Sequence, residues 1–146
     1  MKMIKFKIAT PERIVYEGEI EQLTCPTTTG EITILPDHIP LVSNIQSGEL
    51  RAAEKGREHR FFVSGGCVEV LPDNEVVVLA DASERDQEID LERAEEAKVR
   101  AEKLMKEETL DHEQFAETQA SLERALARLK IGGRKRYRDV GRQAPI

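Results

Sequence analysis

Hydrophobic and polar residues alternate along the first half of the chain, as they do in strands that bury one face. In residues 3–8, isoleucine and phenylalanine occupy one face and lysine occupies the other. Further short apolar runs lie at residues 13–16, 20–25, 31–35, 41–45, 49–53, 60–63, 67–71 and 75–80. Turn residues separate these runs about every 8–12 positions, which is typical of sandwiches and barrels. We expect an antiparallel β-sandwich over residues 1–84.

The pattern becomes helical after a linker at residues 85–89. Asp90 is a good N-cap residue for a first helix that should reach about Lys106. Its small residues repeat at spacings of three and four, at Ala94, Ala97, Ala101 and Leu104. This spacing predicts a narrow face that lets another backbone approach closely.

A second helix is predicted from a capping box at Asp111 and Gln114. Its expected apolar stripe consists of Phe115, Leu122, Leu126 and Leu129. Gly132-Gly133 is expected to end this helix after Ile131. The two helices should then form an antiparallel hairpin over residues 90–131, followed by a basic, flexible tail at residues 132–146.

Charge is distributed unevenly along the chain. The formal net charge of −6 divides into −5 for residues 1–83, −8 for residues 84–123 and +7 for residues 124–146. The acidic excess argues against nucleic-acid binding over the whole surface, and the basic end predicts contact with one acidic partner. No apolar run approaches the roughly 20 residues that a membrane span needs, so we expect no direct membrane insertion.

The sequence contains no recognisable catalytic or metal-binding motif. Its three histidines are isolated, and Cys25 and Cys67 lack metal-ligand spacing, so both cysteines are expected to be small buried hydrophobic residues. Ser64 precedes Gly65-Gly66 without a nucleophile elbow, and these glycines are expected in a tight turn or bulge. We expect a chain that is not an enzyme by itself and has no metal and no obligatory cofactor.

Four arginines of the predicted hairpin lie at helical spacings. Arg93 and Arg100 are seven residues apart, and Arg124 and Arg128 are four apart, so each pair shares one helix face. Two interpretations of these spacings remain open. The four side chains converge and clamp a polyphosphate, or they are solvated and pair with neighbouring glutamates.

Four ordered motifs resemble the epsilon subunit family of F-type ATP synthases of bacterial or chloroplast type. They are Gly30-Glu31-Ile32 with Leu35-Pro36-Asp37-His38-Ile39-Pro40-Leu41, Val63-Ser64-Gly65-Gly66-Cys67-Val68-Glu69-Val70, Val78-Leu79-Ala80-Asp81-Ala82, and Ile89-Asp90-Leu91-Glu92-Arg93-Ala94. The resemblance covers about residues 1–131 and implies a non-catalytic rotor subunit of the central stalk. Members of the family usually have Gly where this chain has Thr33 and Asp37.

The resemblance also implies which surfaces meet partners. The sandwich would bind the gamma subunit and stand on the rotor ring of c subunits, with the loop that holds Glu31 and His38 facing the ring. The hairpin would be a regulatory arm, folded in one state and extended toward the alpha/beta catalytic head in the other. Arg124, Arg128 and Lys130 would then contact an acidic region of the head and inhibit ATP hydrolysis. The whole complex would translocate protons or sodium ions.

ATP is a further ligand that the resemblance implies. Some members bind ATP, which holds the hairpin folded, through a motif that this chain matches at Ile89, Asp90, Arg93 and Ala94. The matching partner residues are Glu84, Arg100, Arg124 and Arg128.

By the same resemblance, the isolated protein would be a monomer that does not bind nucleic acid. It would be peripheral to the cytoplasmic face of a bacterial inner membrane or to the stromal face of a thylakoid. A protein of another class fits the pattern too: a free-standing sandwich that binds a ligand or a protein, with the hairpin as a dimerisation arm. The basic end alone would also suit a nucleic-acid anchor.

Overall fold

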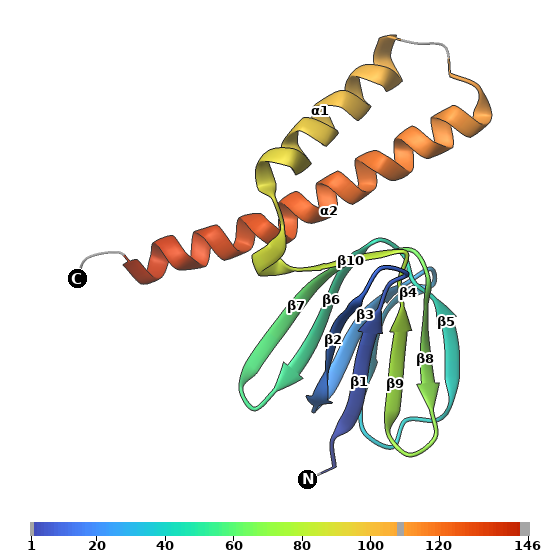
Figure 1. Ribbon diagram of the computed structural model, residues 1–146, viewed down its shortest axis with the longest axis vertical. Coiled ribbons are helices and arrows are strands. Elements are labelled where there is room, and N and C mark those ends of the chain that lie inside the picture. Colours follow the sequence, from blue (N-terminus) through green and yellow to red (C-terminus); the bar gives the residue numbers. More distant parts are fainter. Residues whose placement is uncertain (1, 108–109, 144–146) are drawn as a thin grey trace. The chain divides into compact units, whose positions relative to one another are not determined.

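The computed structural model describes the backbone of residues 2–107 and 110–143 (Figure 1). Side chains are described for residues 2–106 and 110–133. The chain divides into two compact units, Met1–Arg85 and Asp86–Ile146. The first unit consists of strands, and the second consists of helices. The boundary lies one residue beyond position 84, where the sequence pattern places the end of the sandwich.

The first unit is a β-sandwich of two five-stranded sheets, which confirms the expected fold class. One sheet has the order β2-β1-β9-β8-β5, formed by Ile14–Ile20, Ile4–Ala9, Glu75–Leu79, Cys67–Leu71 and Leu41–Asn44. The other has the order β10-β7-β6-β3-β4, formed by Ala82–Arg85, Arg57–Ser64, Gly48–Glu54, Gln22–Thr27 and Gly30–Ile34. The two layers lie face to face in Figure 1.

Neighbouring strands are antiparallel except at one place. β1 runs parallel to β9, with Phe6 opposite Val76 and Ile8 opposite Val78. The first sheet is therefore mixed. Turn signals between consecutive apolar runs predict antiparallel hairpins. The pairing of β1 with β9 joins strands that are distant in sequence, so no local signal predicts it.

The core lies between the two sheets and follows the alternation of β1. Ile4, Phe6 and Ile8 are buried together with Phe61 and Val63 of β7. The lysines that alternate with these residues lie on the opposite side of the strand. The prediction from residues 3–8 is confirmed.

The two cysteines differ in burial, and both are free thiols. Cys25 is buried in the core, as expected, and burial raises the pKa of its thiol to about 12. Cys67 is only half-buried, so its predicted burial is wrong. In β8 the side chains of Val68 and Val70 point into the core, and the period of two places Cys67 on the other face.

A tight turn between β7 and β8 contains Gly65 and Gly66, with φ angles of 67° and 94°. A Cβ atom on Gly66 would lie 1.8 Å from the carbonyl oxygen of Leu79. Both the backbone conformation and the space therefore demand glycine at this position. The expected role of this glycine pair in a tight turn is confirmed.

The second unit begins with the short helix η1 (Asp86–Glu88), followed by α1 (Leu91–Glu107) and α2 (His112–Gln143). Both predicted helix starts are confirmed. The Asp90 carboxylate accepts a hydrogen bond from the backbone N–H of Arg93 at 3.1 Å. Asp111 and Gln114 bond reciprocally, each side chain accepting from the other residue's backbone N–H, at 2.8 and 3.3 Å.

Small residues form the contact between α1 and α2. Ala101 of α1 shares a hollow with Thr118 and Ser121 of α2, and Ala125, one turn after Ser121, is buried. The predicted stripe on α2 is wrong at Phe115 and Leu126, which are 43% and 45% exposed. The other two residues of the predicted stripe, Leu122 and Leu129, are half-buried.

The predicted end of the second helix is also wrong, because α2 continues through Gly132-Gly133 to Gln143. Each glycine lowers helix stability by about 1 kcal/mol relative to alanine, which weakens a helix without forbidding it. Gly132 also has a packing role, because a Cβ there would lie 2.5 Å from Cδ2 of Leu91. Of the expected flexible tail, residues 132–143 are helical, and residues 144–146 lie outside the described residues.

Candidate interaction surfaces

The residues that the sequence predicts to contact partners or to bind ATP are divided between the two units. Glu31, His38 and Glu84 belong to the sandwich, and the others belong to the hairpin. Among the described residues, no group of three or more His, Cys, Asp or Glu side chains is placed to hold a metal ion. None of the described helices combines the length and the hydropathy of a membrane span.

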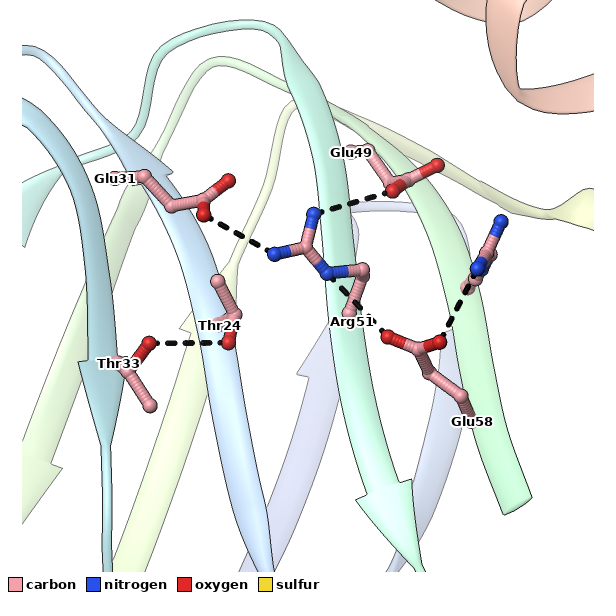
Figure 2. A network of polar contacts seen from close by, with 7 residues as sticks. Thr24, Glu31, Thr33, Glu49, Arg51 and Glu58 are labelled. Atoms are coloured by element: carbon pink, nitrogen blue, oxygen red, sulfur yellow. Dashed lines mark hydrogen bonds and ion pairs between the residues drawn. The ribbon is translucent and has the colours of Figure 1, made fainter. Parts of the chain in front are cut away.

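A charged network covers the outer face of the second sheet (Figure 2). Arg51 of β6 lies at its centre and pairs with Glu31 at 3.1 Å and with Glu49 and Glu58 at 3.4 Å each. Glu58 also pairs with Arg60, at 3.1 Å. Figure 2 shows the carboxylates reaching Arg51 from strands on both sides and from β6 itself.

Three glutamates meet two arginines in this network. Burial lowers the pKa of the Arg51 guanidinium, but hydrogen bonds from Arg51 to Glu31 and Glu49 outweigh burial, so the pKa is raised. Arg51 stays charged and fixes the three carboxylates on β4, β6 and β7. The surface is an ordered patch of paired charges.

The family resemblance implies that one loop holds both Glu31 and His38. In the structure, the two residues do not lie in the same loop. Glu31 lies near the start of β4 and is held by Arg51, whereas His38 follows the end of that strand. The rise of about 3.3 Å per residue separates Glu31 from Ile34 by about 10 Å of strand. The two residues therefore belong to opposite ends of β4.

His38 lies in the connection between β4 and β5, beside two exposed apolar side chains. Leu35 is 53% exposed and Ile39 is 75% exposed. The Nδ1 atom of His38 lies 2.6 Å from the carbonyl oxygen of Ile39. A carbonyl can only accept, so Nδ1 of His38 is the donor in this bond, and Nε2 lies on the other side of the ring.

Asp37 fixes the backbone of this connection. Its φ angle of 65° is in the left-handed region, where glycine is usual and aspartate is tolerated. Its carboxylate bonds to Lys2 at 2.9 Å and to the Asn74 amide at 3.2 Å. Sequence reasoning missed Lys2 and Asn74, although Asp73-Asn74 between two apolar runs is a turn signal.

Three residues of the proposed ATP motif have structural contacts in the hairpin. Asp90 caps α1, Ala94 is buried, and Ile89 lies close to Gly132, with Cγ2 3.3 Å from where a Cβ would be. The fourth, Arg93, is exposed. A helix start therefore explains much of this motif without a ligand.

The arginines of the hairpin are not all gathered in one hollow. A hollow of about 170 Å³ between the helices includes Arg100 together with Glu117, and it does not include Arg124 or Arg128. Arg124 and Arg128 are half-buried on α2, whereas Lys130 is exposed. Glu84 lies in β10, opposite Phe62 of β7.

A β-sandwich followed by a two-helix hairpin defines the class of two-unit proteins to which this chain belongs. Residues 3–86 match the ATP synthase delta/epsilon chain β-sandwich domain, and residues 87–133 match the long α-helix domain of the same chain. The chain belongs to the ATP synthase delta/epsilon chain family. The resemblance in the four motifs is confirmed.

Full-length relatives agree with this assignment. An ATP synthase epsilon chain of Dehalococcoides mccartyi is 46% identical over 136 residues, covering 93% of this chain and 96% of the relative. One of Nitratidesulfovibrio vulgaris is 41% identical over 134 residues, covering 90% and 97%.

Solved structures share the fold at low sequence identity. A chain in the F1/c-ring structure of Euglena gracilis mitochondrial ATP synthase has a TM-score of 0.71 at 21% identity, covering 83% of this chain and 76% of that chain. A chain in the central stalk/c-ring structure of the Tetrahymena thermophila enzyme has a TM-score of 0.66 at 15% identity, covering 90% and 97%.

Proposed function

We propose that this protein is the epsilon-type subunit of the central stalk of an F-type ATP synthase, where it couples rotor-ring rotation to the catalytic head and restrains ATP hydrolysis. The observation that carries the proposal is the match of both family domains, in order, to residues 3–133. The names of the relatives and the central-stalk origin of a solved structure with this fold support it.

The proposed partners follow from this assignment. The sandwich binds the gamma subunit and meets the c-subunit ring, and we propose that the ring contacts both His38 and, from the other end of β4, Glu31. The protein is peripheral to the cytoplasmic face of a bacterial membrane, or to the stromal face of a thylakoid, and the complex translocates protons or sodium ions. Isolated, it is a monomer, which sedimentation velocity tests directly.

Inhibition rests on the charge and length of α2. Residues 124–143 contain eight basic residues and one acidic residue. A helix of 32 residues spans about 48 Å at a rise of about 1.5 Å per residue. Because α2 continues through Gly132-Gly133, Arg124, Arg128 and Lys130 lie on one uninterrupted helix that can present them to an acidic part of the alpha/beta head.

The decisive experiment measures ATP hydrolysis by a head that lacks this subunit, with three full-length chains added back. We expect the wild-type chain to inhibit and the α2 triple variant R124E/R128E/K130E to inhibit at least tenfold less, since opposed charges become like charges. The matched control reverses three α1 lysines, as K98E/K103E/K106E, and should inhibit like the wild type.

Other outcomes have clear meanings. If the two triple variants lose inhibition equally, the effect is one of net charge, and the assignment of the α2 surface is wrong. If none of the chains binds the head with gamma, the stalk assignment fails and the free-standing sandwich replaces it.

ATP is proposed as a regulatory ligand that stabilises the folded hairpin through Asp90, Arg93, Arg100, Arg124 and Arg128, with Glu84 and the flanking Ile89 and Ala94. ATP can favour the folded state only by its differential affinity, and a tenfold preference shifts the balance by about 1.4 kcal/mol. Calorimetric titration of ATP into the wild type and into R93A tests this. Equal heats of binding would rule out a clamp that uses Arg93.

A further inference from the structure

Three segments that are distant in sequence meet at Asp37. The Lys2 ammonium lies 2.9 Å from one carboxylate oxygen of Asp37. The side-chain amide of Asn74 donates to the other oxygen at 3.2 Å and also accepts a bond from the backbone N–H of Asp37. We call Lys2, Asp37 and Asn74 the loop clamp, because they tie the β4–β5 connection to the chain before β1 and to the β8–β9 turn.

The clamp is anchored in the sandwich at its Asn74 end. The carbonyl oxygen of Asn74 accepts a hydrogen bond from the backbone N–H of Lys5, in β1, at 2.8 Å. Asn74 has a φ angle of 58°, and its neighbour Asp73 has a φ angle of 65°, so both occupy the left-handed region. The two bonds of the Asn74 amide to Asp37 orient this amide and hold Asp37 in a backbone conformation that side chains disfavour.

The segment that the clamp fixes carries side chains that the sandwich itself does not use. Leu35 and Ile39 are more than half exposed, and the Nδ1 proton of His38 is already bonded to the Ile39 carbonyl. An ordered backbone that displays apolar side chains loses little further conformational freedom on contact with a partner. The ion pair and the hydrogen bonds of the clamp thus order this exposed segment for binding to a partner.

We propose that Lys2, Asp37 and Asn74 are positioning residues that preorganise His38 and Ile39 for contact with the rotor ring. This rests on the proposed function for the identity of the partner, while the preorganisation belongs to the isolated chain. The partner surface should offer an apolar patch to Ile39 and a hydrogen-bonding group to Nε2 of His38. The clamp residues themselves need not touch the ring.

A matched pair of glycine variants isolates the clamp, because both positions are left-handed residues of one turn. N74G removes the amide that bonds Asp37, whereas D73G introduces the same backbone freedom and leaves that amide in place. In the isolated full-length chain, we expect N74G to lower the ¹H–¹⁵N heteronuclear NOE of the His38 and Ile39 amides to values typical of flexible loops, and D73G to leave it at the rigid value. Equal values in both variants would overturn the clamp.

Binding to purified gamma and c-ring complexes supplies the second measurement. We expect N74G to bind about tenfold more weakly than D73G, corresponding to about 1.4 kcal/mol. D37N should restore most of the binding lost in D37A, because asparagine keeps a bond to the Asn74 amide and tolerates the left-handed region. A flexible loop in N74G with unchanged ring binding would overturn the positioning role. Absence of wild-type binding would instead refute the proposed function, and the NOE comparison would still decide the clamp.

Discussion

Left-handed backbone positions show most directly how single residues shape this sandwich. Gly65 and Gly66 occupy such positions at the β7–β8 turn, and Asp37, Asp73 and Asn74 do so elsewhere with side chains. The glycines and the residues with side chains differ in the space around the Cβ position and in their hydrogen bonds. The glycines abut other atoms, whereas Asp37 and Asn74 each have a polar partner that offsets the unfavourable backbone conformation.

Substitution G66A should therefore be among the most damaging single changes in the sandwich. Its methyl group would overlap the Leu79 carbonyl, 1.8 Å away, at a φ of 94° that alanine avoids. We expect the free energy of unfolding to fall by about 3 kcal/mol or more, measured by urea denaturation. G56A is the control, since its φ of 77° is also left-handed but no atom lies within 4 Å of the added Cβ. Equal losses would show that overlap is not the cause.

Asp37 should also give the loop clamp a dependence on pH. Its hydrogen bond to Lys2, followed by that to Asn74, lowers the pKa of its carboxyl below the usual value of 3.8. A lowered pKa means that the stabilisation is complete above the unfolded value and is lost as pH falls through the folded value. An NMR titration of the carboxyl should show this lowered pKa in the wild type and a higher one in K2M. The same pKa in both would remove Lys2 from the clamp.

At the scale of elements, local signals predicted the starts of the helices better than their ends. Asp111 and Gln114 identify the start of α2 because a capping box lies within four consecutive residues. The end was mispredicted because Gly132 and Gly133 are weak helix residues, and a contact with Leu91, about 40 residues earlier, favours glycine at position 132. Strand β10 was also not predicted by a local signal, because it lacks apolar alternation. It is held by its pairing with β7 and by the Ser83 hydroxyl, which donates to the Phe62 carbonyl at 2.8 Å.

The two glycines of α2 should respond differently to alanine. In G133A nothing lies within 4 Å of the new methyl group, so stability should rise by up to about 1 kcal/mol through helix propensity. In G132A the methyl group would lie 2.5 Å from Cδ2 of Leu91, so this side chain must rotate and the gain should shrink or reverse. Thermal unfolding followed by circular dichroism compares the two. An equal gain at both positions would show that Gly132 has no packing role.

At the scale of the whole molecule, each unit has its own buried residues. The core of the sandwich extends from Ile4 to Ala80, and none of the hairpin side chains that the structure describes belongs to it. The order of strand-like and helical patterns predicted this division well. The loop clamp was not predictable in the same way, because its members are 35 and 37 residues apart and meet only when two turns of the sandwich come together.

A fragment of residues 1–85 should consequently fold alone. Because all core residues are retained, we expect a single cooperative urea transition and dispersed amide resonances for this fragment. The fragment can then be compared with the full chain for its contact with gamma. A broad, non-cooperative transition would show that the sandwich needs the hairpin in order to fold.

The parallel pairing of β1 with β9 bears on how the protein is made. β1 lies between β2 and β9. The backbone N–H and C=O groups on the edge of β1 that pairs with β9 therefore stay without their strand partner until residues 75–79 have left the ribosome. Chain growth at about 5–20 residues per second leaves that edge open for several seconds, while nascent chains on one messenger lie close together. Lys5 and Lys7 alternate along this strand, and like charges oppose edge-to-edge association of two unfinished copies. β1 is thus synthesised well before the strand that encloses its second edge, and the charges of its lysines act during that interval.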